Sequence, residues 1–262
     1  MNASNGNYDV IVIGAGSVGV PAAYYTAKAG MKVLVIDRYA SVGQGANKAA
    51  IGGVRATHSD TAKIQIGLKS IEILSTWQET HGDNIEWQTG GYTFVAYGPH
   101  EEKTLKGLLK IQHSYGLNID WLDSDELRQA VPALRADGLL GGTFSPEDGS
   151  ASPLLTLHAF YRQACLQGAE FRFGETVTAI PVSEGRITGV ETDRGRYGAP
   201  VVINAAGAHA NQISSLAGVD SPVTPDAHEG GITEPVARFL EPMVVDIRPR
   251  PGSSNFYFYQ HH

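Results

Sequence analysis

Three glycines near the N-terminus have the spacing that nucleotide-binding turns use. Gly14, Gly16 and Gly19 form a G-x-G-x-x-G motif. In such a turn the first glycine allows the tight bend, the second lets backbone N–H groups approach a pyrophosphate, and the third lets the next helix pack closely. The partial positive charge of the helix N-terminus favours the phosphates. The motif predicts a dinucleotide site made by Gly14, Ala15, Gly16, Ser17, Val18 and Gly19.

The chain around this motif supplies the elements that the turn needs. Residues 9–13 and 32–36 are apolar runs typical of buried strands, and residues 20–29 have the pattern of a helix between them. Asp37 follows the second run, 18 residues after Gly19. A carboxylate there accepts hydrogen bonds from ribose hydroxyls and disfavours a 2′-phosphate. The alternative is a glycine turn and a surface aspartate in an α/β fold that binds no nucleotide.

The composition excludes several classes of protein. The formal net charge of −7 and the pI of about 5.7 lack the basic footprint that nucleic acids attract. Cys165 is the one cysteine, which excludes an intrachain disulfide and fits a buried thiol in a reducing compartment. Residues 1–7 are short and polar, unlike a signal peptide, and no apolar run reaches the ~20 residues of a membrane span. We therefore expect a cytoplasmic protein without a transmembrane segment.

Hydrophobic periodicity divides the chain into alternating blocks. Helical patterns cover residues 61–81, 101–115, 123–131 and 154–167. Residues 85–97 are typical of a hairpin around Gly90 and Gly91, and strand patterns cover residues 170–173, 177–181, 186–193, 201–204, 231–233, 243–247 and 255–259. We predict an α/β fold with two discontinuous, interleaved domains. They are a Rossmann-like domain, residues 1–84 and 150–221, and an α+β domain on an antiparallel sheet, residues 85–149 and 222–262.

Three segments together resemble one family of flavoproteins. They are VIVIGAGSVG at 10–19, VGQGANKAAIGGVR at 42–55 and VVINAAGAHA at 201–210. With Asp37, they resemble the FAD-dependent D-amino-acid oxidase and sarcosine oxidase superfamily over essentially the whole chain. The GGVR stretch and residues 232–235 are most similar to the branch with sarcosine and dimethylglycine dehydrogenases, glycine oxidase and dye-linked proline dehydrogenases. The resemblance implies FAD as the cofactor and a substrate-binding role for the second domain.

The resemblance also implies which further residues contact FAD. It places Val177 beside the adenine and a strand end, Ala205 to Gly207, under the cofactor. A strand that ends in Ala-Ala-Gly independently suits a close backbone approach. Lys48 would stand near flavin N5 or a flavin carbonyl, although a solvated loop lysine is an equal alternative. The full set that the resemblance adds is Arg38, Gly45, Ala46, Lys48, Gly52, Gly53, Val177, Ala205, Ala206 and Gly207.

Two positions depart from the family pattern. His209 stands where the family often has a tryptophan. The family continues into a return segment near the flavin's pyrimidine end, whereas this sequence stops at His262. We therefore expect the chain to be C-terminally incomplete.

Amine oxidation by a flavin sets modest demands on the protein. A hydride moves from the carbon beside nitrogen to flavin N5, so the protein mainly orients the substrate. The substrate carboxylate needs a cation, and the bidentate fork of arginine supplies it best. Arg55 is the first candidate, with His58 three residues on; a solvent-facing arginine is the alternative. The family places tyrosines of the last strand over the substrate, which implicates Tyr257 and Tyr259, although a core aromatic pair fits equally.

These observations predict an FAD-dependent oxidoreductase that acts on the C–N bond of a small amino acid or a secondary or N-methyl amine. One alternative is oxidation of a C–OH bond in a hydroxy acid or polyol, with His58 or His209 as base. Another is a non-catalytic nucleotide-binding subunit or fragment, and a third is an NAD-dependent dehydrogenase.

The sequence bears less on partners. The electron acceptor stays open between oxygen, a quinone and a partner flavoprotein, and the oligomeric state is open too. Three histidines attract attention as metal ligands: His228 beside Glu229, and the pair His261 and His262. No HExxH motif or Cys/His cluster accompanies them, so we predict no metal.

Overall fold

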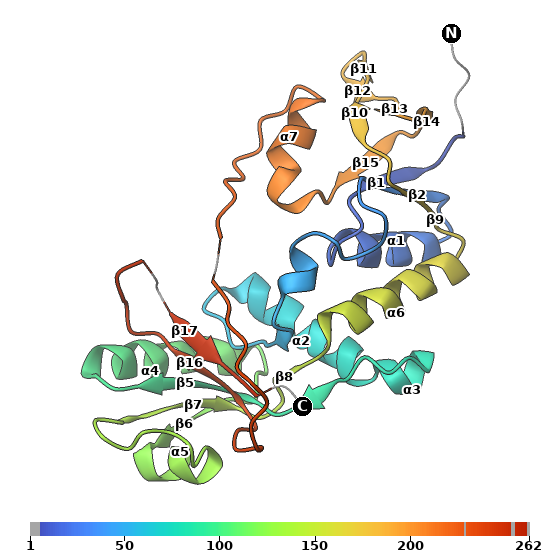
Figure 1. The fold of residues 1–262 in the computed structure, drawn as a ribbon. Coiled ribbons are helices and arrows are strands. Elements are labelled where there is room, and N and C mark those ends of the chain that lie inside the picture. The colour runs from blue at the N-terminus through green and yellow to red at the C-terminus, as the bar shows by residue number, and fades with distance from the viewer. Residues whose placement is uncertain (1–5, 228, 253–254, 261–262) are drawn as a thin grey trace. The chain divides into compact units, whose positions relative to one another are not determined.

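The computed structural model describes residues 6–227, 229–252 and 255–260, so His228, His261 and His262 lie outside the described residues. The chain forms two compact units, each built from two segments (Figure 1). The first unit contains residues up to Ile51 together with Pro153–Gly231. The second contains Gly52–Ser152 and the residues from Ile232 on.

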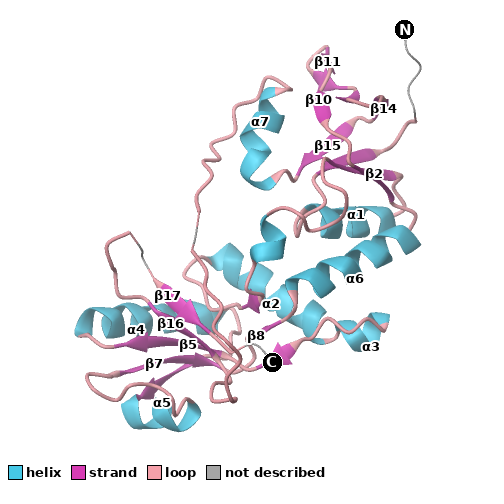
Figure 2. Ribbon diagram, in the orientation of Figure 1, coloured by secondary structure: helices cyan, strands magenta, loops and turns pink. Residues whose placement is uncertain are grey.

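A four-stranded parallel sheet forms the centre of the first unit (Figure 2). Its order is β15 (Val201–Asn204), β1 (Val10–Ile13), β2 (Val33–Asp37) and β9 (Glu170–Phe173). The middle strands β1 and β2 are apolar up to the terminal Asp37 of β2 because both of their faces are covered. Their register pairs Val10 with Val33 and with Val201, which brings the carboxyl ends of β1, β2 and β15 to one edge.

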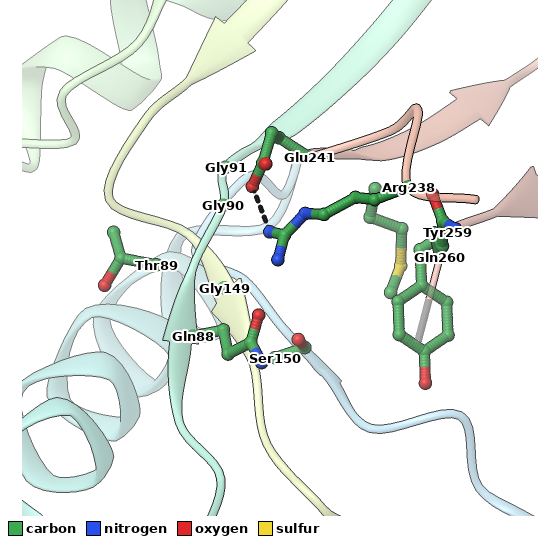
Figure 3. A pocket seen from close by; sticks show the side chains of 11 residues that line it. Gln88, Thr89, Gly90, Gly91, Gly149, Ser150, Arg238, Glu241, Tyr259 and Gln260 are labelled. Carbon is green, nitrogen blue, oxygen red and sulfur yellow. Dashed lines mark hydrogen bonds and ion pairs between the residues drawn. The ribbon is translucent and has the colours of Figure 1, made fainter. Parts of the chain in front are cut away.

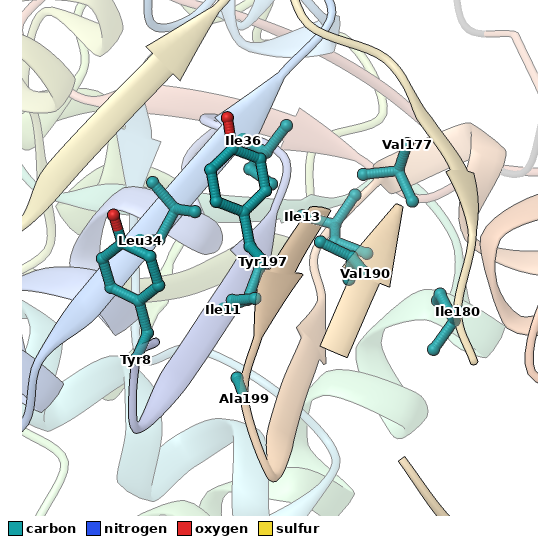
Figure 4. Packing of buried hydrophobic residues seen from close by; sticks show 10 residues of the cluster. All are labelled: Tyr8, Ile11, Ile13, Leu34, Ile36, Val177, Ile180, Val190, Tyr197 and Ala199. Atoms are coloured by element: carbon teal, nitrogen blue, oxygen red, sulfur yellow. The ribbon is translucent and has the colours of Figure 1, made fainter. Parts of the chain in front are cut away.

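Different layers cover the two faces of this sheet. Helices α1 (Gly19–Lys28) and α6 (Pro153–Leu166) pack against each other, and the rings of Tyr24 and Phe160 meet edge to face at 5.8 Å. A small antiparallel sheet of β10 (Val177–Ala179), β13 (Gly189–Thr192) and β14 (Arg196–Gly198) contributes to the core on the other face. Alternate residues of β1 and β2 meet it in one buried cluster (Figure 4). The cluster contains Tyr8, Ile11, Ile13, Leu34, Ile36, Val177, Ile180, Val190, Tyr197 and Ala199.

Shorter elements complete the first unit. They are the 3-10 turns η1 (Ala46–Ala49) and η2 (Gly207–His209), helix α7 (Ala210–Ser215), and the strand pair β11 (Val182–Ser183) and β12 (Arg186–Ile187).

A five-stranded sheet forms the centre of the second unit. Its order is β17 (Phe256–Phe258), β16 (Met243–Asp246), β5 (Tyr92–Ala96), β7 (Gly141–Ser145) and β6 (Asp120–Asp123). The pairing of β16 with β5 is parallel and the other three pairings are antiparallel. The expected antiparallel sheet is therefore a mixed one, because β16 joins from a distant segment and runs alongside β5.

Two helices pack on this sheet from opposite faces (Figure 1). Leu127 of α5 (Ser124–Ala130) packs with Val95 and Val244. Lys106 of α4 (Pro99–Ser114) lies over the ring of Trp121, whose neighbour Leu122 joins the α5 cluster. Successive residues of a strand point to opposite faces, so the two helices cover different faces.

The remaining elements of the second unit surround a small three-stranded sheet. Strand β8 (Gly149–Ser150) pairs on one side with β3 (Gly53–Val54) and on the other with β4 (Gln88–Thr89). Helices α2 (Thr61–Ser75) and α3 (Trp77–His81) follow β3 in the chain. No helix among the described residues is long and apolar enough to cross a membrane.

Several predicted elements are corrected by the structure. The helix expected at 61–81 breaks at Thr76, whose hydroxyl donates to the Glu72 carbonyl and so competes with helix continuation. The strand expected at 186–193 divides before Gly189, which adopts a φ of +152°. Residues 231–233 form no strand; glycines 230 and 231 and Pro235 weaken any ladder there. Cys165, expected to be a buried thiol, is exposed, because it lies outside the face of α6 that buries Leu157, Phe160 and Ala164.

The hairpin expected at 85–97 was wrong. Strand β4 pairs with β8, and β5 pairs with β7 and β16, so the two strands belong to different sheets. Gly91, with a φ of +81°, turns the chain from β4 into β5. Its N–H donates to the Asp148 carbonyl, and its carbonyl accepts the N–H of Met243. Long-range hydrogen bonds thus replace the local turn that the Gly-Gly pair suggested.

The compact units also divide the chain differently from the predicted domains. They change over after Ile51, Ser152 and Gly231, whereas we expected changes after residues 84, 149 and 221. Residues 52–84 belong to the second unit for a packing reason. Leu68 and Ile71 of α2 pack against the buried cluster of Ala56, Leu117 and Ile119, and β3 pairs with β8.

Candidate functional site

The glycine motif forms a turn that tolerates no side chain at two of its positions. Gly14 has a φ of +108°, and a Cβ there would lie 2.4 Å from the carbonyl oxygen of Ala205. A Cβ at Gly19 would lie 1.9 Å from the carbonyl oxygen of Gly14. By contrast, no atom lies within 4 Å of the Cβ position at Gly16. The turn therefore packs tightly on the protein side and is open where a pyrophosphate would approach.

The helix behind the turn presents an uncapped amino end. Val18, the N-cap of α1, makes no side-chain capping hydrogen bond, and the first turn contains no acidic residue. The Val18 side chain is 68% exposed and Ser17 is exposed. The partial positive charge of this ten-residue helix is thus not neutralised by a side chain at its N-cap or first turn, as an anion-binding end requires.

Asp37 connects the glycine turn to the end of β2. One carboxylate oxygen accepts the N–H of Ala15 at 2.6 Å, and the other accepts the N–H of Tyr39 at 2.8 Å. Each carboxylate oxygen has two lone pairs, so the side chain keeps capacity for ribose hydroxyls. The structure adds a role that sequence reasoning missed, because Asp37 also fixes the backbone of the turn.

Arg38 and His209 form a second link between these strand ends. The Arg38 guanidinium lies 2.8 Å from His209 Nε2 and donates to the Tyr39 hydroxyl at 3.0 Å. A guanidinium only donates, so His209 Nε2 is the acceptor and its Nδ1–H donates to Gln212 Oε1 at 3.0 Å. His209 therefore joins the loop after β2 to the turn after β15. It fills the position where the family often has tryptophan.

The other predicted cofactor residues fall into three places. Ala205, Ala206 and Gly207 follow β15 beside the glycine turn, and Val177 is buried at the start of β10. The loop residues Gly45, Ala46 and Lys48 are exposed in and around η1. Gly52 and Gly53 belong to the second unit.

Arg55 lies on a segment that the second unit holds firmly. Its guanidinium lies 5.2 Å from the centre of the Phe94 ring, a cation–π contact, and donates to the Thr57 carbonyl. Burial lowers the pKa of Arg55, while Tyr92 and Asp148 oppose that change. The ordinary pKa of an arginine lies far above neutral pH, so the side chain stays a cation there.

Strand register brings the predicted Tyr257 to the same sheet face as Arg55. Tyr257 of β17 pairs with Val245 of β16, which in turn pairs with Phe94 of β5. Paired residues project to the same face, so Tyr257 shares the face on which Arg55 covers Phe94. Tyr259 is half-buried, and burial raises its pKa.

Tyr92 is the residue at the centre of this group, and sequence reasoning missed it. It is buried, and burial raises its pKa; the other groups that act on that pKa are Arg55, Asp148, Tyr257 and Tyr259. Gly53 makes room for it, since a Cβ at Gly53 would lie 1.8 Å from the Tyr92 hydroxyl oxygen. Sequence reasoning missed Tyr92 because its position depends on strand register between segments far apart in the chain, and no local sequence pattern contains that information.

His58 is half-buried at the entrance to α2 and carries no charge at neutral pH. Burial, with the cations of Arg55 and Lys63, lowers its pKa from 6.5 to about 4. A general base works best with a pKa near the operating pH. His58 therefore suits a neutral contact better than the base that hydroxy-acid oxidation would need.

A cavity of about 250 Å³ opens beside Tyr259 in the second unit (Figure 3). Arg238 and Glu241 form an ion pair in its wall. Of the predicted catalytic residues, Tyr259 lines the cavity, whereas Arg55 and His58 do not. Its lining consists of Gln88, Thr89, Gly90, Gly91, Gly149, Ser150, Arg238, Glu241, Met243, Tyr259 and Gln260. Within the described part of the chain, no group of three or more His, Cys, Asp or Glu side chains could hold a metal ion.

Comparison with known proteins identifies relatives over nearly the whole chain. Residues 9–261 match the family described as DAO, FAD dependent oxidoreductase. Mitochondrial sarcosine dehydrogenase of Mus musculus is 27% identical over 232 residues, which are 86% of this chain and 25% of that protein. The chain thus spans about a quarter of the length of this relative.

Solved structures show the same fold. L-proline dehydrogenase from P. horikoshii aligns with a TM-score of 0.82 and 28% identity over 92% of this chain and 64% of that chain. Glycine oxidase from Bacillus cereus ATCC 14579 aligns with a TM-score of 0.67 and 26% identity over 79% of this chain and 57% of that chain. These matches confirm the predicted resemblance, the mixed α/β fold class and FAD as the family's cofactor.

Proposed function

Because the chain belongs to the FAD dependent oxidoreductase family, we propose that it oxidises the C–N bond of a small amino acid or an N-methyl amine. The relatives support this substrate class, since their names record sarcosine, L-proline and glycine as substrates. The alternatives of an NAD-dependent dehydrogenase and a nucleotide-binding subunit without activity fit these relatives less well.

The first unit carries the observation on which the proposal rests. Gly14 and Gly19 allow no Cβ, Gly16 is open, and α1 begins without a side-chain cap. These residues, with Asp37 at the end of β2, would hold the pyrophosphate and ribose of FAD. When bound, FAD supplies the hydride acceptor that amine oxidation needs.

The second unit offers groups for an amino-acid substrate. Arg55 is a half-buried cation with the planar fork that recognises a carboxylate. Tyr257 and Tyr259, with Tyr92 on the same sheet face as Tyr257, would cover the apolar part of the substrate. The neutral ring of His58 adds no second positive charge and no effective base at neutral pH. This set favours C–N oxidation, which needs no dedicated base, over oxidation of a hydroxy acid or polyol.

The test is an anaerobic titration of the purified protein with sarcosine, proline, glycine and D-alanine in turn, followed by visible absorbance. The proposal predicts that one of these amines bleaches the flavin bands. Bleaching by a hydroxy acid such as lactate, and by none of the amines, would contradict it. The cytoplasmic location stays a prediction from the sequence.

A further inference from the structure

Among the described residues of the second unit, Asp148 is the one fully buried acid whose carboxylate accepts hydrogen bonds from the residues that follow Arg55. Its side chain is 0% exposed. One oxygen accepts the backbone N–H of Ala56 at 2.9 Å, and the other accepts the hydroxyl of Thr57 at 2.7 Å. These two residues directly follow Arg55 in the chain.

The backbone of Asp148 is fixed as well. Its carbonyl accepts the N–H of Gly91 at 2.8 Å, at the point where the chain passes from β4 to β5. The next residue, Gly149, pairs with Val54 of β3 and with Thr89 of β4. Asp148 therefore lies where the five-stranded sheet meets the small three-stranded sheet, and its side chain contacts the segment after β3.

The contact with Thr57 extends to the Arg55 side chain. The hydroxyl of Thr57 donates to Asp148, while the carbonyl of the same residue accepts from the Arg55 guanidinium. Rotation or displacement of residue 57 would move the acceptor that holds Arg55 over Phe94. Burial raises the pKa of Asp148 above its ordinary value, and the hydrogen bonds from Ala56 and Thr57 and the Arg55 cation oppose that rise.

We infer that Asp148 is a positioning residue for the substrate carboxylate: through Ala56 and Thr57 it fixes Arg55 in the orientation that binds the anion. This inference rests on the proposed function, in which Arg55 receives the carboxylate. Removing a buried acceptor while its donors stay is costly, because Ala56 and Thr57 then lose their partner. A displacement of about 1 Å at the binding group is enough to lower function by on the order of 100-fold.

The experiment compares three variants of the full chain: Asp148→Asn, Thr57→Val and, as a matched control, Glu147→Gln. Glu147 is the exposed neighbour and binds Asn118 instead. The probes are acetate and its uncharged isostere acetamide, titrated by NMR. Hydrogen exchange of the Ala56 amide reports separately whether the local clamp has opened.

The inference predicts that Asp148→Asn weakens acetate binding about tenfold or more, leaves acetamide binding within about twofold, and accelerates exchange at Ala56. Thr57→Val should weaken acetate selectively too, and it carries the test if Asp148→Asn fails to fold. Glu147→Gln should change none of these values. Equal losses for acetate and acetamide, or unchanged acetate binding with faster Ala56 exchange, would overturn the inference.

A fourth variant separates this inference from the function beneath it. If Arg55→Ala weakens acetate but Asp148→Asn and Thr57→Val do not, the positioning role is wrong and the proposed role of Arg55 stands. If Arg55→Ala leaves acetate binding unchanged, the proposed role of Arg55 fails and the positioning role fails with it.

Discussion

At the scale of single residues, Arg55 combines a fixed place with a permanent charge. It contacts the Phe94 ring and the Thr57 carbonyl, and it is half-buried. A hydrogen bond to a charged group contributes about 1.5–3 kcal/mol, and 1.4 kcal/mol corresponds to a factor of about ten. Loss of a carboxylate contact at this position should therefore be visible in binding.

We predict that Arg55→Ala raises KM for the amino-acid substrate roughly 10- to 100-fold. Arg55→Lys should recover only part of the loss, because an ammonium lacks the bidentate fork. Steady-state kinetics measures both, with Arg135→Ala as the matched control; Arg135 is 79% exposed and pairs with Asp137. A KM for Arg55→Ala equal to that of the control would show that the carboxylate binds elsewhere.

His58 gives a prediction for pH. Its pKa is 6.5 in the unfolded chain and about 4 in the folded chain, so between these values the unfolded chain binds more protons. The contribution of His58 to the free energy of unfolding is therefore fully present above pH 6.5 and is lost as pH falls towards about 4. An NMR titration of the His58 ring should give a midpoint near 4; a midpoint near 6.5 would disprove the buried, cation-flanked environment.

At the scale of elements, two glycines of the nucleotide-binding turn have different roles, one in packing and one in cofactor binding. Gly19 is required for packing, because its Cβ would meet the carbonyl of Gly14 at 1.9 Å, whereas Gly16 has open space. Gly19→Ala should lower the free energy of unfolding of the apoprotein by about 1–3 kcal/mol. Gly16→Ala should leave stability within ~0.5 kcal/mol and weaken FAD binding. Thermal unfolding and FAD titration of both variants measure the two effects; equal melting temperatures would contradict the packing argument.

Helix α5 tests the accuracy of local prediction. Asp123 accepts the N–H groups of Asp125 and Glu126, and Glu126 accepts the N–H of Asp123, so both halves of a capping box are present. Asp123→Ala should cost about 0.5–2 kcal/mol in the free energy of unfolding. Asp125→Ala is the control in the same turn, because Asp125 contributes only its backbone N–H to the cap; chemical denaturation distinguishes the two variants. An equal loss in both would argue for a charge effect in place of capping.

Elements with a local signal were predictable, and those held by distant partners were not. The apolar runs of β1 and β2 and the cap at Asp123 appear in the sequence because their causes lie within a few residues. Strand β7 contains Gly141 and Gly142 and exists because β5 and β6 pair with it on either side. The Gly90–Gly91 pair was mistaken for a hairpin turn for the same reason, since the partners that decide its conformation are Asp148 and Met243.

At the scale of the whole molecule, the same distinction applies to the site. The nucleotide turn was predictable because its residues are consecutive, and the family match agrees with FAD. The surroundings of Arg55 were not predictable. Tyr92, Asp148 and Tyr257 come together through strand pairing between segments up to 165 residues apart, the separation of Tyr92 and Tyr257.

The identity and amount of nucleotide in the purified protein test the central claim most directly. The protein is denatured, and the released nucleotide is identified by chromatography and quantified by absorbance. The account predicts FAD at about one molecule per chain, lost or strongly reduced in Gly16→Ala. Release of NAD in place of FAD, or failure of the folded chain to take up added FAD, would contradict it.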